Sequence, residues 1–123
     1  MRSTDMSKLF EQQADFMRLL HSKGLFQSFP VDITSKQGQK LCKDIAHDAM
    51  DELHEAIQHL RNSKQHRVTE IKEFDRDKYL EELVDHLHFF IELCIVSSVS
   101  AQDLCDAYIR KGEINVERIN AGY

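Results

Sequence analysis

Apolar side chains recur at helical spacing through most of this chain of 123 residues, and this periodicity limits its fold more than any other feature. Near the N-terminus they follow one another at intervals typical of one helix face, at Met6, Leu9, Phe10, Phe16, Met17 and Leu20. The chain contains only one Pro and four Gly, the residues that disfavour helices most. We therefore expect an all-α protein.

Four segments have this periodicity, and we expect helices at residues 4–22, 34–62, 78–97 and from 100 onwards. The first would begin at Thr4 and end before Gly24. Two capping boxes begin the second and fourth helices, Thr34 with Gln37 and Ser100 with Asp103. The polar stretch "NSKQHRVTEIKEFDRD" predicts a solvated connection before the third helix.

The length fits a single domain over residues 1–123, with one hydrophobic core. Short connections between amphipathic helices favour an antiparallel arrangement, because neighbouring helices then bury each other's apolar faces. We expect a four-to-five-helix antiparallel bundle.

Composition excludes several classes of function. A net charge of −5 argues against a protein that grips nucleic acid with a broad basic surface. The longest apolar tract, residues 89–99, is too short to span a bilayer and contains Glu92. The first ten residues lack the apolar core of a signal peptide, and three widely spaced cysteines suit a reducing compartment. We expect a cytoplasmic protein that binds neither membrane nor nucleic acid.

Two carboxylates lie at the edge of the apolar sector of the second helix. Glu52 projects inside this edge, and Glu55 lies about 60° further round the helix. The sector itself comprises Leu41, Ile45, Ala49, Leu53, Ala56 and Leu60. Carboxylates in such a position need a partner, since burial of an unpaired charge is costly.

The third helix supplies two more carboxylates. Its main apolar face comprises Leu80, Val84, Leu87, Ile91 and Cys94, and a second stripe comprises Glu82, Asp85, Phe89, Leu93 and Val96. A helix that is apolar on both sides packs on both sides, so Glu82 and Asp85 would lie at a helix interface. Four such carboxylates favour a divalent cation, and oxygen ligands suit Mg²⁺ or Mn²⁺. The alternative is two solvated acidic faces.

The last helix has a stripe that changes from apolar to polar. Leu104 and Tyr108 are followed on the same face by Lys111, Asn115 and Arg118. Ammonium and guanidinium groups bind phosphate oxygens, so these three residues could hold a nucleoside triphosphate opposite the metal. The alternative is that they are ordinary solvated residues.

The acidic motifs resemble those of a known family. Glu52-Leu-His-Glu55, followed after 26 residues by Glu82-Leu-Val-Asp85, resembles the E-x-x-E…E-x-x-D signature of the all-α NTP pyrophosphohydrolases. This group includes the MazG-like enzymes and the dimeric dUTPases. Within it, "LVDHLHFF" and the ending "YIRKGEINVERINAGY" are most similar to the dimeric dUTPases and phage dCTPase-dUTPases.

The resemblance implies a fold of the all-α NTP pyrophosphatase type, assembled as a homodimer or homotetramer. It implies two or three Mg²⁺ ions per site, replaceable by Mn²⁺, held by Glu52, Glu55, Glu82 and Asp85. The phosphates and sugar would contact Lys111, Asn115, Arg118 and Tyr123. We expect Glu52 and Glu55 to act in hydrolysis of a dNTP to dNMP and pyrophosphate, with Glu55 helping to deprotonate the attacking water. This activity would control a nucleotide pool, in the host cytoplasm if the chain is phage-encoded.

The base-binding residues match the family less closely. The dimeric dUTPases have tryptophans around the base, and this chain has none. Their base-reading Gln and Asn lie four residues apart on the first helix, where this chain has Gln12 or Gln13 and then Phe16 or Met17. Gln13 lies on the apolar face, where an unpaired amide costs about 1–3 kcal/mol. Either a backbone group or a base edge would satisfy it. The leading substrates are dUTP and dCTP, with a purine such as dGTP as the alternative.

Two other classes of function remain open. A di-iron bundle would use carboxylate-x-x-His pairs, of which Asp51 with His54 and Asp85 with His88 have the form. However, Asp51 and His54 project away from the apolar sector. A non-catalytic helical interaction module would need no metal.

Overall fold

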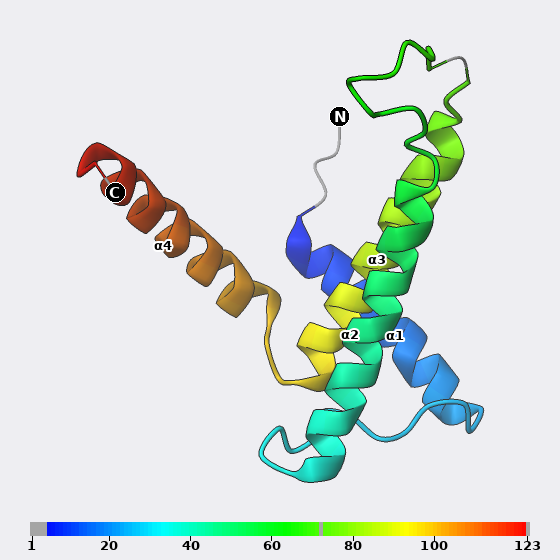
Figure 1. Cartoon of the computed structure of the whole chain (residues 1–123). Coiled ribbons are helices and arrows are strands. Elements are labelled where there is room, and N and C mark those ends of the chain that lie inside the picture. Colours follow the sequence, from blue (N-terminus) through cyan, green and yellow to red (C-terminus); the bar gives the residue numbers. More distant parts are fainter. Residues whose placement is uncertain (1–4, 72, 123) are drawn as a thin grey trace. The chain divides into compact units, whose positions relative to one another are not determined.

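The computed structural model describes residues 5–71 and 73–122, and within them the chain is all-α with no strand. Figure 1 shows the four helices, α1 (Met6–Ser22), α2 (Lys36–Ile57), α3 (Arg76–Val96) and α4 (Ala101–Asn120). The all-α prediction is thus confirmed. The expected first helical residue, Thr4, lies outside the described residues.

The chain divides into two compact units. The central unit, residues 32–93, contains α2 and most of α3. The terminal unit contains α1, the last turn of α3 and α4, in residues 5–31 and 94–122. The single bundle-like domain over residues 1–123 stays a prediction.

Local hydrogen bonds determine where α1 begins and ends. The Asp5 carboxylate accepts a hydrogen bond from the Lys8 N–H at 3.1 Å, which caps the first turn. At the other end, Gly24 has a φ of 72°, and the Leu25 N–H donates to the Leu20 carbonyl at 2.8 Å. Only glycine adopts this left-handed conformation without a steric cost, so α1 ends where the sequence predicted.

The second helix begins one residue later than the Thr34 capping box predicted. The Ser35 hydroxyl accepts the hydrogen bond from the Gly38 N–H at 2.9 Å. Thr34 does not cap the helix because its hydroxyl donates to the Asp32 carboxylate at 2.7 Å. Gly38 is required by packing, since a Cβ at this position would overlap the Asp32 carbonyl.

The second helix also ends at Ile57, five residues before the predicted end at Asn62. After Ile57 the backbone hydrogen bonds link residues three apart instead of four. They run from the His59 N–H to the Ala56 carbonyl and from the Leu60 N–H to the Ile57 carbonyl. Asn62 itself has a left-handed φ of 60°. The connection to α3 is irregular and exposed where it is described, as the polar composition of this segment predicted. Val68 within it is 98% exposed.

Local hydrogen bonds also cap both ends of α3 and the beginning of α4. The Asp75 carboxylate accepts from the Lys78 N–H at 3.1 Å, so α3 begins two residues before the predicted Lys78. It ends at Val96, one residue early, where the Val99 N–H donates to the Cys94 carbonyl and Ser98 has a φ of 64°. The predicted capping box of Ser100 and Asp103 is confirmed, with hydrogen bonds of 3.0 and 3.1 Å.

The buried apolar residues differ in part from those predicted. In the central unit they are Cys42, Ile45, Ala49, Ala56 and Ile91, and in the terminal unit Phe10, Met17, Cys94 and Val96. The assignment of Leu53, Leu60, Leu80 and Val84 to the core was wrong, because each is more than a third exposed. Leu60 lies beyond the end of α2, and the other three lie on helix surfaces that are only partly covered. Phe16 is likewise exposed.

No single helix among the described residues is long and apolar enough to cross a membrane, and only α3 and α4 counted together reach that length and apolar content. The three cysteines are free thiols. Cys42 and Cys94 are buried and Cys105 is half-buried.

Candidate metal and substrate site

Three carboxylates meet where α2 and α3 lie beside each other in the central unit. Glu52 comes from α2, and Glu82 and Asp85 come from successive turns of α3. One carboxylate oxygen from each lies within 4.8 Å of the other two. All three side chains are half-buried. The acidic cluster, as we call Glu52, Glu82 and Asp85, thus presents converging oxygen atoms and retains access to solvent.

Glu55 lies at the solvent edge of the acidic cluster. It is exposed, one turn after Glu52 on α2, and its carboxyl group lies close enough to those of Glu52 and Glu82 to raise their pKa values. The four residues predicted from the two acidic motifs therefore form one connected group.

The proximity of these carboxyl groups raises the pKa of two of them, Glu52 and Glu82. Burial, the charge of Glu55 and a hydrogen bond with Glu55 raise the pKa of Glu52 to about 7, and the charges of Asp85 and Glu82 add to this effect. A hydrogen bond with Glu55 is the main cause that raises the pKa of Glu82, followed by burial and the charges of Glu55 and Asp85. A cation at this site would replace those protons.

Further contacts along α2 and α3 show that the two helices are antiparallel. The His86 Nδ1 atom lies 2.6 Å from the Ala49 carbonyl oxygen. Further along α3, Glu92 interacts with Asp48 of α2. Contacts that move forward on α3 thus move backward on α2, so the predicted antiparallel arrangement holds for this pair (Figure 1).

Glu92 is a buried acid that the sequence did not identify as a candidate. It is only 8% exposed, and burial together with the negative charge of Asp48 raises its pKa to about 7. In the sequence it only interrupts an apolar tract. The available signal was its place beside Ile91 and Leu93, where a surface residue would not be expected.

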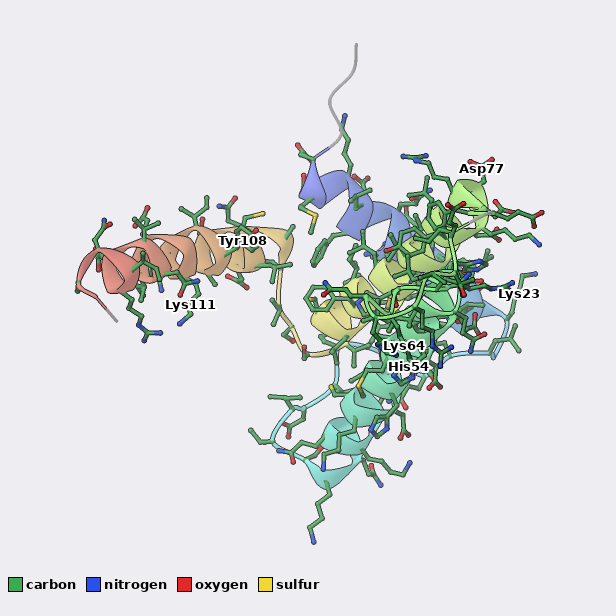
Figure 2. All side chains as sticks on the ribbon, turned by 45° about the horizontal axis from the view of Figure 1, so that its top comes forward. Lys23, His54, Lys64, Asp77, Tyr108 and Lys111 are labelled. Carbon is green, nitrogen blue, oxygen red and sulfur yellow. The ribbon has the colours of Figure 1, made fainter. Side chains whose placement is uncertain are left out.

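The polar stripe on the last helix lies in the terminal unit. Tyr108 and Lys111 project from α4 (Figure 2). Lys111 and Asn115 line a hollow of about 410 Å³, together with Leu104, Ala107, Tyr108 and Gly112. Arg118 lies in the last turn of α4, and Tyr123 lies outside the described residues. Because the stripe and the acidic cluster belong to different units, a shared cleft stays a prediction.

The three residues predicted to contact a base also lie in the terminal unit, on α1. Gln13 is 8% exposed and forms part of the buried face of α1, with Phe10 and Met17. Gln12 and Phe16 are exposed. Of the three, only Gln13 is buried, and a buried amide discriminates between bases more strongly than an exposed one.

The two carboxylate–His pairs of the di-iron alternative do not form one group of potential metal ligands among the described residues. Asp51 and His54 are exposed on α2. On α3, the His88 Nδ1 atom lies 4.0 Å from an Asp85 oxygen, but His88 is exposed. The acidic cluster contains neither Asp51 nor His54.

Comparison with known proteins gives no relative for this chain. No protein-family model, no curated protein sequence and no solved structure matches it.

Proposed function

We propose that this chain is a Mg²⁺-dependent nucleoside triphosphate pyrophosphohydrolase, which converts a dNTP and water to dNMP and pyrophosphate. The observation that supports this proposal most is the convergence of Glu52, Glu82 and Asp85 from two helices, with Glu55 one turn after Glu52. We base the proposed reaction on the resemblance of the two acidic motifs and of the last helix to the all-α NTP pyrophosphohydrolases.

The donor atoms of the acidic cluster suit a hard cation. They are all carboxylate oxygens, and no thiol or imidazole belongs to the set. Mg²⁺ and Mn²⁺ prefer such ligands, whereas a structural zinc site would contain Cys or His. When bound, the cations, two or three by the family resemblance, would supply positive charge against the triphosphate and polarise its oxygens. Glu52, Glu55, Glu82 and Asp85 would hold them.

The side chains of this protein would direct attack at the α-phosphorus. A water oxygen forms the new bond to this phosphorus while the bond to the bridging oxygen of the β-phosphate breaks. Glu55, the exposed member of the acidic group, accepts the water's proton, with Glu52 beside it. Lys111, Asn115 and Arg118 of α4, with Tyr123, would bind the phosphates and sugar and neutralise the departing pyrophosphate.

Gln13 is the proposed reader of the base. A buried amide both donates and accepts hydrogen bonds, so it can pair with the edge of uracil or of cytosine. We take dUTP and dCTP as the leading substrates and a purine such as dGTP as the alternative. Gln12 and Phe16 would flank the base from the exposed side of α1.

A second copy of this chain is the proposed partner, in a homodimer or homotetramer. One exposed apolar stripe runs along α2, in which Met50, Leu53 and Ile57 are 38 to 51% exposed. Their spacing of three and four residues places them on one side of the helix. A contiguous apolar surface of this kind is typical of a protein interface, and a second copy would cover it.

The experiment that tests this proposal measures products and metal binding together. Purified protein with Mg²⁺ should convert at least one of five dNTPs to dNMP and pyrophosphate. Glu52→Gln and Asp85→Asn should lower kcat/KM at least about 100-fold, since second-sphere partners alone account for losses of 10- to 100-fold. Both variants should keep or gain thermal stability without metal, because each removes one repelling charge.

Asp51→Asn is the matched control, since Asp51 is an exposed carboxylate next to Glu52. It should leave kcat/KM within about 3-fold of the wild type. Orthophosphate and dNDP as products would overturn attack at the α-phosphorus. Absence of turnover together with absence of Mn²⁺ binding would favour the non-catalytic interaction module.

A further inference from the structure

His86 joins α3 to the backbone of α2 beside the acidic cluster. Its Nδ1 atom lies 2.6 Å from the Ala49 carbonyl oxygen, across 37 residues of sequence. A carbonyl oxygen only accepts hydrogen bonds, so Nδ1 carries the proton and donates it. The side chain is part-buried, and Ala49 is only 5% exposed. Limited access to water protects this bond from competition.

The two bonded residues lie next to residues of the acidic cluster. His86 directly follows Asp85 on α3. Ala49 lies one helical turn before Glu52 on α2, and residues three apart share a helix face. The bond therefore fixes α2 against α3 at the level where Glu52 meets Asp85.

The acidic cluster does not provide this alignment itself. Its ionised carboxylates repel one another, which favours separation of α2 and α3 when no cation is bound. Small apolar residues such as Ala49 permit close approach of two helices but fix their axial position only weakly. A slip of one helical turn would move each carboxylate by about 5.4 Å, more than the width of the cluster.

We infer that His86 is a positioning residue, which sets the register of α3 against α2 so that the acidic cluster is assembled before a cation binds. The part of this inference that concerns metal binding rests on the proposed function. His86 contacts neither cation nor substrate in this role. It acts by holding Asp85 and Glu82 opposite Glu52.

The test compares two substitutions at the same position. In His86→Asn the amide nitrogen lies as many bonds from Cα as Nδ1 does, so it can donate to the Ala49 carbonyl. His86→Phe keeps a ring and removes the donor. Mn²⁺ affinity, measured by electron paramagnetic resonance, should fall at least about 10-fold in His86→Phe, and stay within about 3-fold of the wild type in His86→Asn.

His88→Phe is the control, because it removes an exposed imidazole near Asp85 that has no bond to α2. It should bind Mn²⁺ within about 3-fold of the wild type. Equal affinity for Mn²⁺ in the wild type and His86→Phe would overturn the inference and leave the proposed function intact. Equal losses in the His86→Asn and His86→Phe variants would also overturn it.

Nuclear magnetic resonance without metal separates this inference from the proposed function. The wild-type His86 ring should be protonated at Nδ1, and the amide signals of Glu52, Glu82 and Asp85 should shift in His86→Phe and not in His86→Asn. A ring protonated at Nε2 alone, or unshifted amides in His86→Phe, would overturn the register role. A wild type with these signals but no Mn²⁺ binding would instead contradict the proposed function.

Discussion

Glu92 occupies a well-buried turn of α3, next to Ile91, and faces the negative charge of Asp48. Burial and that charge raise its pKa from 4.5 to about 7. Between these two pH values the folded protein binds a proton that the unfolded chain releases. The free energy of unfolding therefore decreases as the pH rises from 4.5 to about 7, and the loss is complete above 7.

Glu92→Gln should remove this loss, because its amide stays neutral at every pH. Urea unfolding with EDTA should show equal stability for the variant and wild type near pH 4.5. Above pH 7 the variant should be more stable by at most about 3–4 kcal/mol, since each tenfold change in proton affinity corresponds to about 1.4 kcal/mol. Glu81→Gln, an exposed position on the same helix, should show no such gain. Parallel stability curves for the wild type and Glu92→Gln from pH 5 to 8 would contradict this account.

Single residues also show which parts of the site the sequence could predict. Glu52, Glu82 and Asp85 were recognisable because helical spacing alone places carboxylates beside an apolar sector. The burial of Glu92 could not be recognised from the sequence, since it depends on which side of α3 other residues cover. For His86 the sequence indicated a packing or supporting side chain, but not its partner, because its hydrogen bond to the Ala49 carbonyl depends on the register between two helices.

At the scale of the helices, two glycines in helical segments should respond oppositely to the same substitution. A Cβ at Gly38 in α2 would overlap the Asp32 carbonyl, whereas a Cβ at Gly112 in α4 would meet no atom within 4 Å. Gly38→Ala should lower the free energy of unfolding by about 1–3 kcal/mol, the usual cost of overpacking. Gly112→Ala should raise it by about 0.5–1 kcal/mol, because alanine restricts the unfolded chain. Urea unfolding measures both, and a stabilised Gly38→Ala variant would contradict the tight turn before α2.

Helix boundaries were predictable where one residue alone could form the cap. Ser100 with Asp103 forms the predicted capping box of α4. At α2 two hydroxyl residues are adjacent, and the Asp32 carboxylate engages Thr34 and leaves Ser35 to cap the helix. Periodicity cannot make that choice. The early end of α2 was hidden for a similar reason, because apolar Leu60 continues the helical pattern beyond the helix.

At the scale of the whole molecule, the exposed apolar stripe on α2 predicts self-association. Sedimentation equilibrium should give two or four times the chain mass of 14.4 kDa. Ile57→Asp places a charge in the stripe and should lower the mass toward 14.4 kDa, because burial of an unpaired charge is costly. Val68→Asp, a fully exposed position in the connection before α3, should leave the mass unchanged. A wild type that stays monomeric at every concentration would contradict the proposed assembly.

The all-α fold could be predicted because four segments of 3.6-residue periodicity with few Gly or Pro admit few other folds. Which faces of these helices other residues cover could not be predicted. Leu53, Leu80 and Val84 have the spacing of core residues and are exposed in the single chain, since amphipathicity does not specify whether another helix or another copy covers a face.

Hydrolysis in water enriched in ¹⁸O tests whether the acidic cluster on α2 and α3 serves attack by water at the α-phosphorus. The leading substrates, dUTP and dCTP, would be incubated with the protein and Mg²⁺, and the products examined by mass spectrometry. We expect one ¹⁸O atom in the nucleoside monophosphate and none in pyrophosphate, with no product formed by Glu52→Gln. Label in pyrophosphate or orthophosphate, or equal turnover by Glu52→Gln, would contradict it.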